Sequence, residues 1–211
     1  DQISNQIKAI FLCSPNNPSG NSFRREDLLT LVQSFDGLVV VDEAYIDFST
    51  QDSLIEELSN YPNFIITQTL SKAYGMAGIR LGICIASEEI IAILNKIKPP
   101  YNINTLTQER AIDSLQDKES IQAQIKQLMD ERSRLYEQLQ GVSFVEKVYP
   151  SDANFLLVRV DDADKRYAQL IENDIVVRNR SQQYGCENCL RFSVGTADEN
   201  KILIQTLNRL S

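Results

Sequence analysis

Short apolar runs alternate along the chain with segments in which apolar residues recur every three or four positions. Runs such as "LVVVD" at residues 38–42 are typical of buried strands, and the second pattern is typical of amphipathic helices. The alternation predicts an α/β fold. The expected strands are residues 8–13, 38–41, 63–67, 79–85, 144–148, 154–160, 175–178 and 190–194, and the expected helices are residues 24–35, 53–59, 88–97, 165–173 and 198–210.

A longer stretch of helical spacing covers residues 105–140, and we expect it to break near Asp117. The sequence "KPPY" at residues 98–101 predicts a stop before it, because proline disfavours helix both at its own position and at the residue before it. The pattern therefore predicts two domains, residues 1–105 and residues 106–211, with the long helical stretch leading into the second.

Composition narrows the possible functions. Of the 211 residues, 43% are hydrophobic and 24% charged, and the net charge is −8. An acidic chain of this kind argues against a nucleic-acid partner bound through phosphates. The apolar runs are too short to predict a membrane span, and four cysteines without a signal-peptide pattern predict a cytoplasmic protein. The absence of histidine excludes Ser-His and Cys-His nucleophile chemistry.

Four polar features directly follow or end predicted strands, where open α/β sheets bind their ligands. They are "SPNNPSG" at residues 14–20, "VDEAY" at residues 41–45, "TQTLSKAYGMAGIRLG" at residues 67–82, and "CLRFSVGT" at residues 189–196. Each also has a structural interpretation. The first is a plausible turn, Asp42 could lie at a solvated strand end, Lys72 could be a surface lysine, and Arg191 could face solvent on a one-sided sheet.

The neighbours of Lys72 favour a binding role. Hydroxyl groups precede it, glycines that let a backbone approach a ligand follow it, and an arginine suited to phosphate ends the segment. The combination can hold a phosphate beside a lysine amine. Its members are Thr69, Ser71, Gly75, Gly78 and Arg80.

As a set, these motifs resemble the fold type I pyridoxal-phosphate (PLP) aminotransferases. The segments "NNPSG", "VDEAYIDF", "LSKAYGMAGIRLG", "DANFLLVRV" and "LRFSVGT" are most similar to the histidinol-phosphate aminotransferase family. The resemblance implies a mostly parallel sheet from the C-terminal part of the large PLP-binding domain, followed by a small α+β domain. It also implies that an N-terminal portion of the family precedes this sequence.

The resemblance further implies a role for each motif. Lys72 would form a Schiff base with PLP, and Asp42 would keep the pyridine nitrogen protonated. Asn17 and Tyr45 would bind the phenolic oxygen of PLP. The phosphate of PLP would bind Thr69, Ser71 and Arg80. The acidic end of the substrate would bind Arg191 and Arg178, with Asn154 near them.

The implied activity is transamination between histidinol phosphate and 2-oxoglutarate or glutamate, in a homodimer. Two related activities stay open, aromatic amino-acid transamination and phosphothreonine decarboxylation, because fold alone does not fix function. A non-catalytic fragment is the alternative from another class. Cys186 and Cys189 form a CxxC motif, which we interpret as free thiols rather than half of a metal site, because no histidine and only two other cysteines are present.

Overall fold

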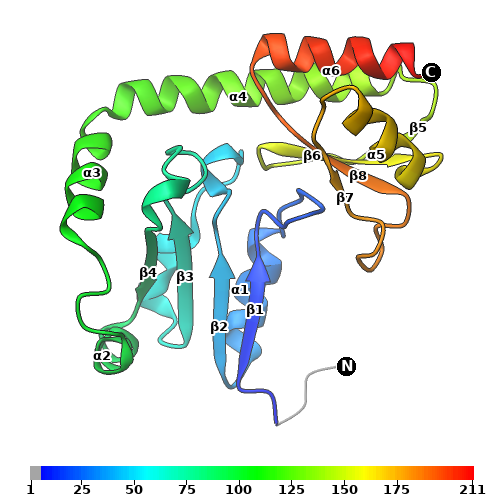
Figure 1. Cartoon of the computed structure of the whole chain (residues 1–211). Coiled ribbons are helices and arrows are strands. Elements are labelled where there is room, and N and C mark those ends of the chain that lie inside the picture. The colour runs from blue at the N-terminus through cyan, green and yellow to red at the C-terminus, as the bar shows by residue number, and fades with distance from the viewer. Residues whose placement is uncertain (1–5) are drawn as a thin grey trace. The chain divides into compact units, whose positions relative to one another are not determined.

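The computed structural model describes residues 6–211, so the first five residues of the predicted first domain lie outside it. The chain divides into two compact units. Of the described residues, the first comprises 6–15 and 22–122, and the second comprises 16–21 and 123–211. Figure 1 shows the elements of each unit.

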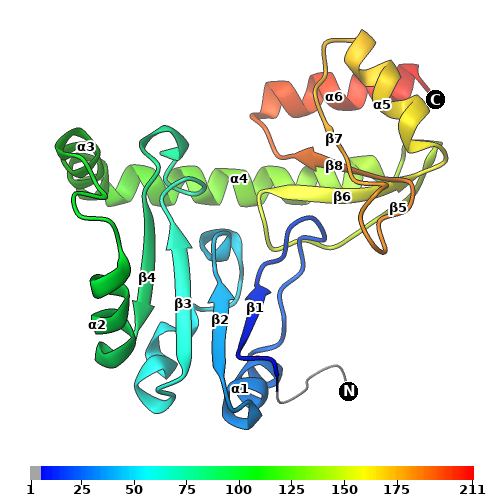
Figure 2. The same cartoon turned by 60° about the horizontal axis from the view of Figure 1, so that its bottom comes forward.

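A four-stranded sheet forms the centre of the first unit, in the order β1-β2-β3-β4. The strands are β1 (Ala9–Cys13), β2 (Leu38–Asp42), β3 (Phe64–Thr69) and β4 (Gly82–Ala86). The first three run parallel, and β4 runs antiparallel to β3. Figures 1 and 2 both show the four strands side by side. The carboxyl ends of β1, β2 and β3 therefore lie at the same edge of this sheet.

One face of this sheet is covered by α1 (Arg25–Ser34) and by η2, a 3-10 helix over Leu54–Asn60. Side chains alternate between the faces of a strand, so every second residue of β2 and β3 reaches this core. The buried residues of the cluster are Leu28, Val32, Phe35, Val39, Val41, Leu54, Phe64 and Ile66.

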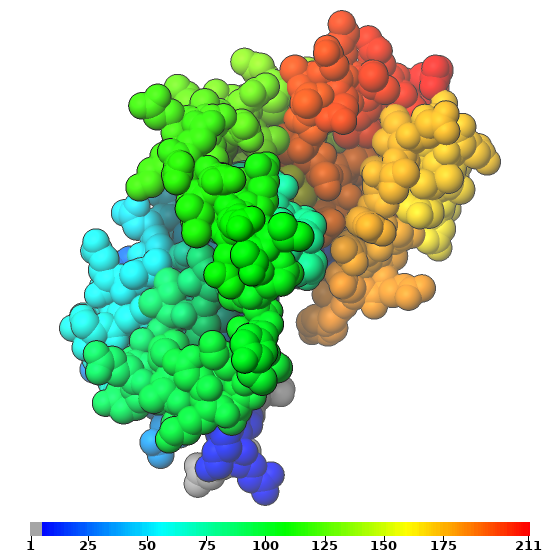
Figure 3. Space-filling view, turned by 60° about the vertical axis from the view of Figure 1, so that its left-hand side comes forward, coloured from blue at the N-terminus to red at the C-terminus, as the bar shows by residue number. Residues whose placement is uncertain are grey.

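The rest of the first unit consists of two short 3-10 helices, η1 (Ile46–Phe48) and η3 (Ala77–Ile79), and two α-helices, α2 (Glu88–Ile97) and α3 (Thr105–Gln116). Figure 3 shows α2 and α3 in green along one side of this unit. Helix α3 packs through Ala111 against the loop that follows β3.

The second unit contains an antiparallel sheet in the order β5-β6-β8-β7. Its strands are β5 (Val145–Val148), β6 (Phe155–Val160), β7 (Arg178–Asn179) and β8 (Cys189–Ser193). Its helices are α4 (Lys118–Leu139), which begins in the first unit, α5 (Ala163–Glu172) and α6 (Ala197–Arg209). The core between sheet and helices includes Leu135, Leu139, Leu156, Val158, Leu170, Leu190, Phe192, Leu203 and Leu207.

The predicted fold class is confirmed, with a mostly parallel first sheet and an antiparallel second one. The break near Asp117 is also confirmed, since α3 ends at Gln116 and α4 begins at Lys118. The compact units, however, divide after Gln122, whereas the predicted domains divide after residue 105. Helix α3 belongs to the first unit because Thr107 Oγ1 donates a hydrogen bond to the Ile79 carbonyl at 3.2 Å.

Two predicted strands have different bounds in the structure. Residues 79–85 do not form one strand, because Arg80 adopts the left-handed conformation (φ 56°) that ends η3, and β4 starts only at Gly82. The strand predicted at residues 175–178 is reduced to Arg178–Asn179, the two residues that pair with β8. The predicted helix at residues 53–59 is the 3-10 helix η2.

Candidate active site

Asp42 is the last residue of β2 and faces away from the core beneath the sheet. Its neighbour Val41 belongs to that core, and alternation turns Asp42 to the opposite face. The Oδ1 atom of Asp42 accepts a hydrogen bond from the Ala44 N–H at 3.1 Å and another from Thr67 Oγ1 at 3.3 Å. The carboxylate is half-buried. The structure therefore fixes one carboxylate oxygen with two protein donors.

Lys72 lies in the closed loop that follows β3. The Met76 N–H donates to the Leu70 carbonyl at 3.0 Å, and the Gly75 N–H donates to the Lys72 carbonyl at 3.0 Å. Gly75 has a φ of 64°, a conformation that glycine adopts without steric cost. The Lys72 side chain is exposed, and its Nζ lies 5.3 Å from the centre of the Tyr45 ring, a cation-π distance. The ammonium group and the Tyr45 ring are thus neighbours.

The three residues predicted to bind the phosphate of PLP lie around the same loop. Ser71 donates its backbone N–H to Thr69 Oγ1 at 3.1 Å, and Thr69 Oγ1 donates to the Leu81 carbonyl at 3.4 Å. Arg80 donates from Nη1 to the Ala77 carbonyl at 3.0 Å. The Thr69 hydroxyl is therefore held at the start of the loop by the Ser71 backbone N–H, and the Arg80 guanidinium is bound to its own turn.

Glu43, which the sequence analysis did not single out, is buried on the opposite face of the sheet from Asp42 and is 2% exposed. It accepts hydrogen bonds from Ser53 Oγ at 2.6 Å, from the Leu54 N–H at 2.9 Å and from Gln68 Nε2 at 2.9 Å. Three donors offset the cost of burying a carboxylate. Glu43 therefore ties the end of β2 to β3 and to the start of η2.

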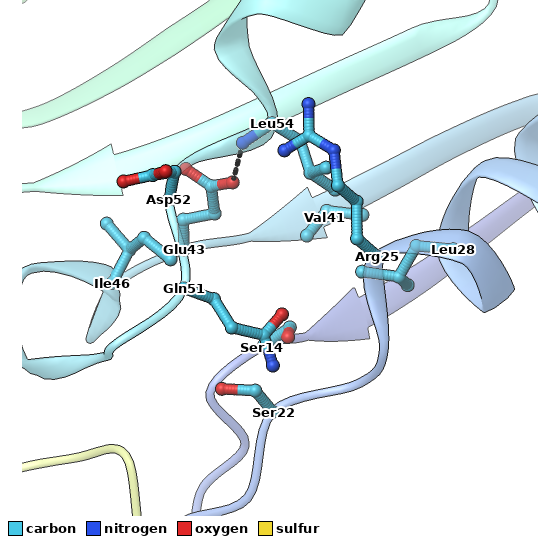
Figure 4. A pocket seen from close by; sticks show the side chains of 10 residues that line it. All are labelled: Ser14, Ser22, Arg25, Leu28, Val41, Glu43, Ile46, Gln51, Asp52 and Leu54. Carbon is cyan, nitrogen blue, oxygen red and sulfur yellow. Dashed lines mark hydrogen bonds between the residues drawn. The ribbon is translucent and has the colours of Figure 1, made fainter.

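A small pocket lies beside Glu43, and Figure 4 shows the side chains that line it. Ser14 and Ser22 also line it. Its cavity volume is about 10 Å³, room for about one water molecule. This pocket is therefore too small for a cofactor.

Two titratable groups near the Lys72 loop have displaced pKa values. Burial raises the pKa of the Asp47 carboxyl, and the nearby Glu43 carboxylate adds to this effect. Burial also raises the pKa of the Tyr74 hydroxyl, with a contribution from Asp47. Asp47 belongs to η1 and Tyr74 to the loop that carries Lys72. An acid and a phenol therefore lie near each other between these two segments.

We expect Asp47→Asn to stabilise the protein at pH 7. The pKa of Asp47 is higher in the folded state than the value of about 3.9 typical of an unfolded chain. The folded state therefore binds the proton more tightly, and its stability falls as pH rises through this interval. Thermal unfolding should show a higher Tm for Asp47→Asn at pH 7 and a smaller difference at about pH 3, below the unfolded value.

The matched control for this stability measurement is Asp36→Asn, because Asp36 is an exposed acid in the same unit. Its Tm should change little at either pH. A Tm of Asp47→Asn below that of the unsubstituted protein at pH 7 would show that Asp47 is a net stabilising carboxylate.

The second unit holds the other predicted residues. Arg191 donates from Nη1 to Asn17 Oδ1 at 2.8 Å, and its guanidinium carbon lies 4.8 Å from the centre of the Phe155 ring. Arg178 lies directly opposite Arg191 in the pairing of β7 with β8, so both side chains project from the same face of this sheet. Asn154 accepts the Val194 N–H through its backbone carbonyl at 2.9 Å.

The segment that carries Asn17 is fixed by backbone contacts. The Asp152 N–H donates to the Gly20 carbonyl at 2.7 Å. Gly20 has a φ of 80°, and a Cβ at this position would collide with the Ser151 side chain. Only glycine therefore fits here, and it holds the segment in the position from which Asn17 contacts Arg191.

Cys186 and Cys189 are free, buried thiols. The Cys189 N–H donates to the Cys186 carbonyl at 3.0 Å, which closes a turn. Burial raises the pKa of both thiols, and a raised pKa disfavours the reactive thiolate. Over residues 6–211 no group of three or more candidate side chains is placed to hold a metal ion.

The predicted site residues thus fall into two groups. In the first unit, Lys72 and Tyr45 are neighbours, Thr69 and Ser71 are neighbours, and Asp42 lies at the adjoining strand end. In the second unit, Arg191 contacts Asn17 and lies opposite Arg178. Asn17 was expected to bind the cofactor, and its contact in this structure is with the predicted substrate arginine.

Comparison with known proteins identifies the family of the chain. Residues 1–207 match the family described as aminotransferase class I and II. A histidinol-phosphate aminotransferase from Flavobacterium johnsoniae is 58% identical over 211 residues, which are 100% of this chain and 60% of that protein. A second, from Christiangramia forsetii, is 57% identical over 209 residues, 99% of this chain and 60% of that protein. The chain therefore spans about 60% of the length of these curated relatives.

Solved structures give the same result. The histidinol-phosphate aminotransferase from Clostridium acetobutylicum superimposes with a TM-score of 0.91 at 28% sequence identity, over 97% of this chain and 64% of that one. A decarboxylase from Sulfurospirillum multivorans gives a TM-score of 0.85 at 30% identity, over 96% of this chain and 61% of that one. The chain belongs to the aminotransferase class I and II family.

Proposed function

We propose that the protein transfers the amino group of histidinol phosphate to 2-oxoglutarate with PLP as cofactor. The observation that carries the proposal is the position of Lys72, whose amine lies against the Tyr45 ring in the loop directly after β3. The 58% identity to a relative named histidinol-phosphate aminotransferase supports the choice of substrate.

The chemistry of the donor set fits PLP. An amine, a carboxylate and a phenol are available for the ring and its substituents at Lys72, Asp42 and Tyr45. The hydroxyls of Thr69 and Ser71, with Arg80, offer the neutral and cationic donors that a phosphate needs. When bound, PLP supplies an electron sink that makes the Cα proton of an amino substrate removable.

Each residue of the first unit then has a defined task. With PLP bound, the Lys72 amine would hold the cofactor through its carbonyl carbon and would serve as the base for the substrate Cα proton. Asp42 would hold a proton at the ring nitrogen, because a nearby negative charge favours the protonated form. The Tyr45 hydroxyl would donate to the phenolic oxygen, and so would Asn17 from the second unit. Arginine could not replace Lys72, because a guanidinium does not lose its proton in proteins.

The residues of the second unit would bind the acidic end of each substrate. Arg191 and Arg178 project from one sheet face, and the planar guanidinium fork matches both carboxylate and phosphate oxygens. A site that accepts histidinol phosphate in one half-reaction and 2-oxoglutarate in the other needs this tolerance. Asn154, next to Phe155 at the start of β6, is the third proposed member.

Substrate assays test this function and its alternatives. We expect the purified protein with PLP to form glutamate from 2-oxoglutarate in the presence of histidinol phosphate, with kcat/KM at least about tenfold above that with phenylalanine. One lost phosphate contact, worth about 1.5–3 kcal/mol, accounts for a difference of this size. Phenylalanine as the better donor would favour aromatic transamination, and release of carbon dioxide from phosphothreonine would favour the decarboxylase.

The non-catalytic alternative has its own readout. The protein is titrated with PLP, and the visible absorbance band of lysine-bound PLP is recorded. A folded protein that gives no such band would support the alternative of a non-catalytic fragment and would contradict the proposed function.

The predicted homodimer and the cytoplasmic location are part of the same proposal. Between residues 6 and 211, no helix combines the length and apolar character needed to cross a membrane. Sedimentation velocity would report the mass in solution, and a monomer at micromolar concentration would contradict the homodimer.

A further inference from the structure

Asp42 belongs to a row of four residues that crosses the sheet of the first unit. In the strand pairing, Asp42 lies opposite Cys13 on β1 and opposite Thr67 on β3, and Thr67 lies opposite Cys84 on β4. Side chains of directly paired residues project from the same face of a sheet. The Asp42 carboxylate is therefore flanked on its own face by a thiol and by a hydroxyl.

The two oxygens of Asp42 have different partners. Oδ1 accepts from Thr67 Oγ1 at 3.3 Å and from the Ala44 N–H at 3.1 Å. Oδ2 has Cys13 Sγ at 4.0 Å, and a thiol is a weak donor. A carboxylate offers about four acceptor positions. Oδ2 is therefore the oxygen with capacity to bind a ligand, and Oδ1 is the one fixed by the protein.

Thr67 is well placed to fix the orientation of the Asp42 carboxylate. It is β-branched and lies in a strand, where its χ1 angle has few options. Its backbone carbonyl accepts the Glu43 N–H at 2.8 Å, which holds β3 against the end of β2. By contrast, the terminal torsion of an aspartate is broad, so the carboxylate needs an external donor to keep one orientation.

We propose that Thr67 is a positioning residue: its hydroxyl orients the Asp42 carboxylate so that Oδ2 faces the ring nitrogen of bound PLP. The inference rests on the proposed function, and it assigns a task to a residue outside the predicted site. A purely structural role for Thr67 would need only a β-branched side chain, which valine also supplies.

The test compares Thr67→Val, which removes the hydroxyl, with Thr67→Ser, which keeps it. In Thr67→Val we expect kcat to fall about fivefold with little change in KM, as the loss of one neutral hydrogen bond predicts. Affinity for PLP should fall by a similar factor. Thr67→Ser should restore both values to within about twofold of the unsubstituted protein, because its hydroxyl can make the same bond.

A spectroscopic readout separates positioning from folding. A proton at the ring nitrogen is a positive charge that opposes protonation at the Lys72 nitrogen. If Asp42 holds that proton less firmly, the pH midpoint of the absorbance change of bound PLP should rise. The expected rise is about 0.7 pH units, because one unit is a tenfold change (1.36 kcal/mol) and 0.7 units corresponds to the same fivefold factor. The midpoint should return to its original value in Thr67→Ser.

The matched control is Thr30→Val. Thr30 Oγ1 donates to the Glu26 carbonyl on the exposed side of α1 at 2.7 Å, so its loss should leave the midpoint and kcat unchanged. If Thr67→Val does not fold, Thr67→Ala removes the same hydroxyl without added bulk and replaces it in every comparison.

Two results would overturn the inference. One is a Thr67→Val variant with the original midpoint and kcat, and the other is a Thr67→Ser variant as impaired as Thr67→Val. A failure of the proposed function looks different, because the unsubstituted protein itself would then show no absorbance band with PLP.

Discussion

Replacement of Lys72 by alanine should remove both the visible band of lysine-bound PLP and all transamination. The Lys72 amine is the group in the first unit that lies against Tyr45 and is able both to bind the cofactor carbonyl and to move a proton. Loss of a nucleophile that is also the base should lower kcat by about 10⁴-fold or more. Absorbance with added PLP and a transamination assay measure the two effects.

Two comparisons make the Lys72 test specific. Lys72→Arg keeps the positive charge, but arginine cannot lose its proton to become a neutral nucleophile. This variant should therefore be as inactive as Lys72→Ala. Lys96→Ala removes an exposed lysine from α2 and should behave like the unsubstituted protein. Borohydride reduction followed by peptide mapping should place the PLP label on Lys72. A label on another lysine, with activity kept in Lys72→Ala, would remove the central assignment.

The fold could largely be predicted from the sequence because period-two and period-3.6 patterns report which side chains are buried. The run at residues 38–42 is an example, since Val39 and Val41 are fully buried and Asp42 ends the strand. The strand predicted at residues 79–85 failed for a local reason. Arg80 has a positive φ, a conformation that glycine adopts far more readily than arginine. A hydrophobic pattern carries no information about the dihedral angle of a single residue.

Part of the candidate site also lies beyond sequence patterns. Thr67 and Asp42 are far apart in sequence, and their contact depends on the register between β2 and β3. A hydrophobic pattern fixes which face a residue occupies, but it does not specify which residue of the next strand lies opposite. The contacts of Glu43 are equally hard to predict. Alternation predicts that its side chain turns toward the core, but it does not identify the three donors, which come from Ser53, Leu54 and Gln68.

Motif spacing does not define the contacts of the predicted loop residues. Asn17 occurs in a turn that composition predicts, and its partner Arg191 is 174 positions away in the sequence. Gly20, three residues further along the same segment, has a backbone conformation that leaves no room for a side chain next to Ser151. Sequence patterns identify such glycines as turn residues and do not identify what they pack against.

Asp42→Ala should still accept PLP at Lys72 but should lose transamination by about 10²-fold or more. The carboxylate is not the group that bonds to the cofactor, so the visible band should persist. Without it, the proton at the ring nitrogen loses its counter-charge, and the electron sink weakens. Asp36→Ala removes an exposed acid of the same unit and is the control. Undiminished kcat in Asp42→Ala would mean that the ring nitrogen has a different partner.

The same variant also tests how Thr67 acts. If the Thr67 hydroxyl works only by orienting Asp42, Thr67→Val should have no further effect in a protein that already carries Asp42→Ala. Two residues in contact are expected to be non-additive, and the double-mutant cycle measures their coupling. An effect of Thr67→Val that stays near fivefold in the Asp42→Ala background would show that the hydroxyl acts independently of the carboxylate. The 3.3 Å contact between them would then be a consequence of strand register alone.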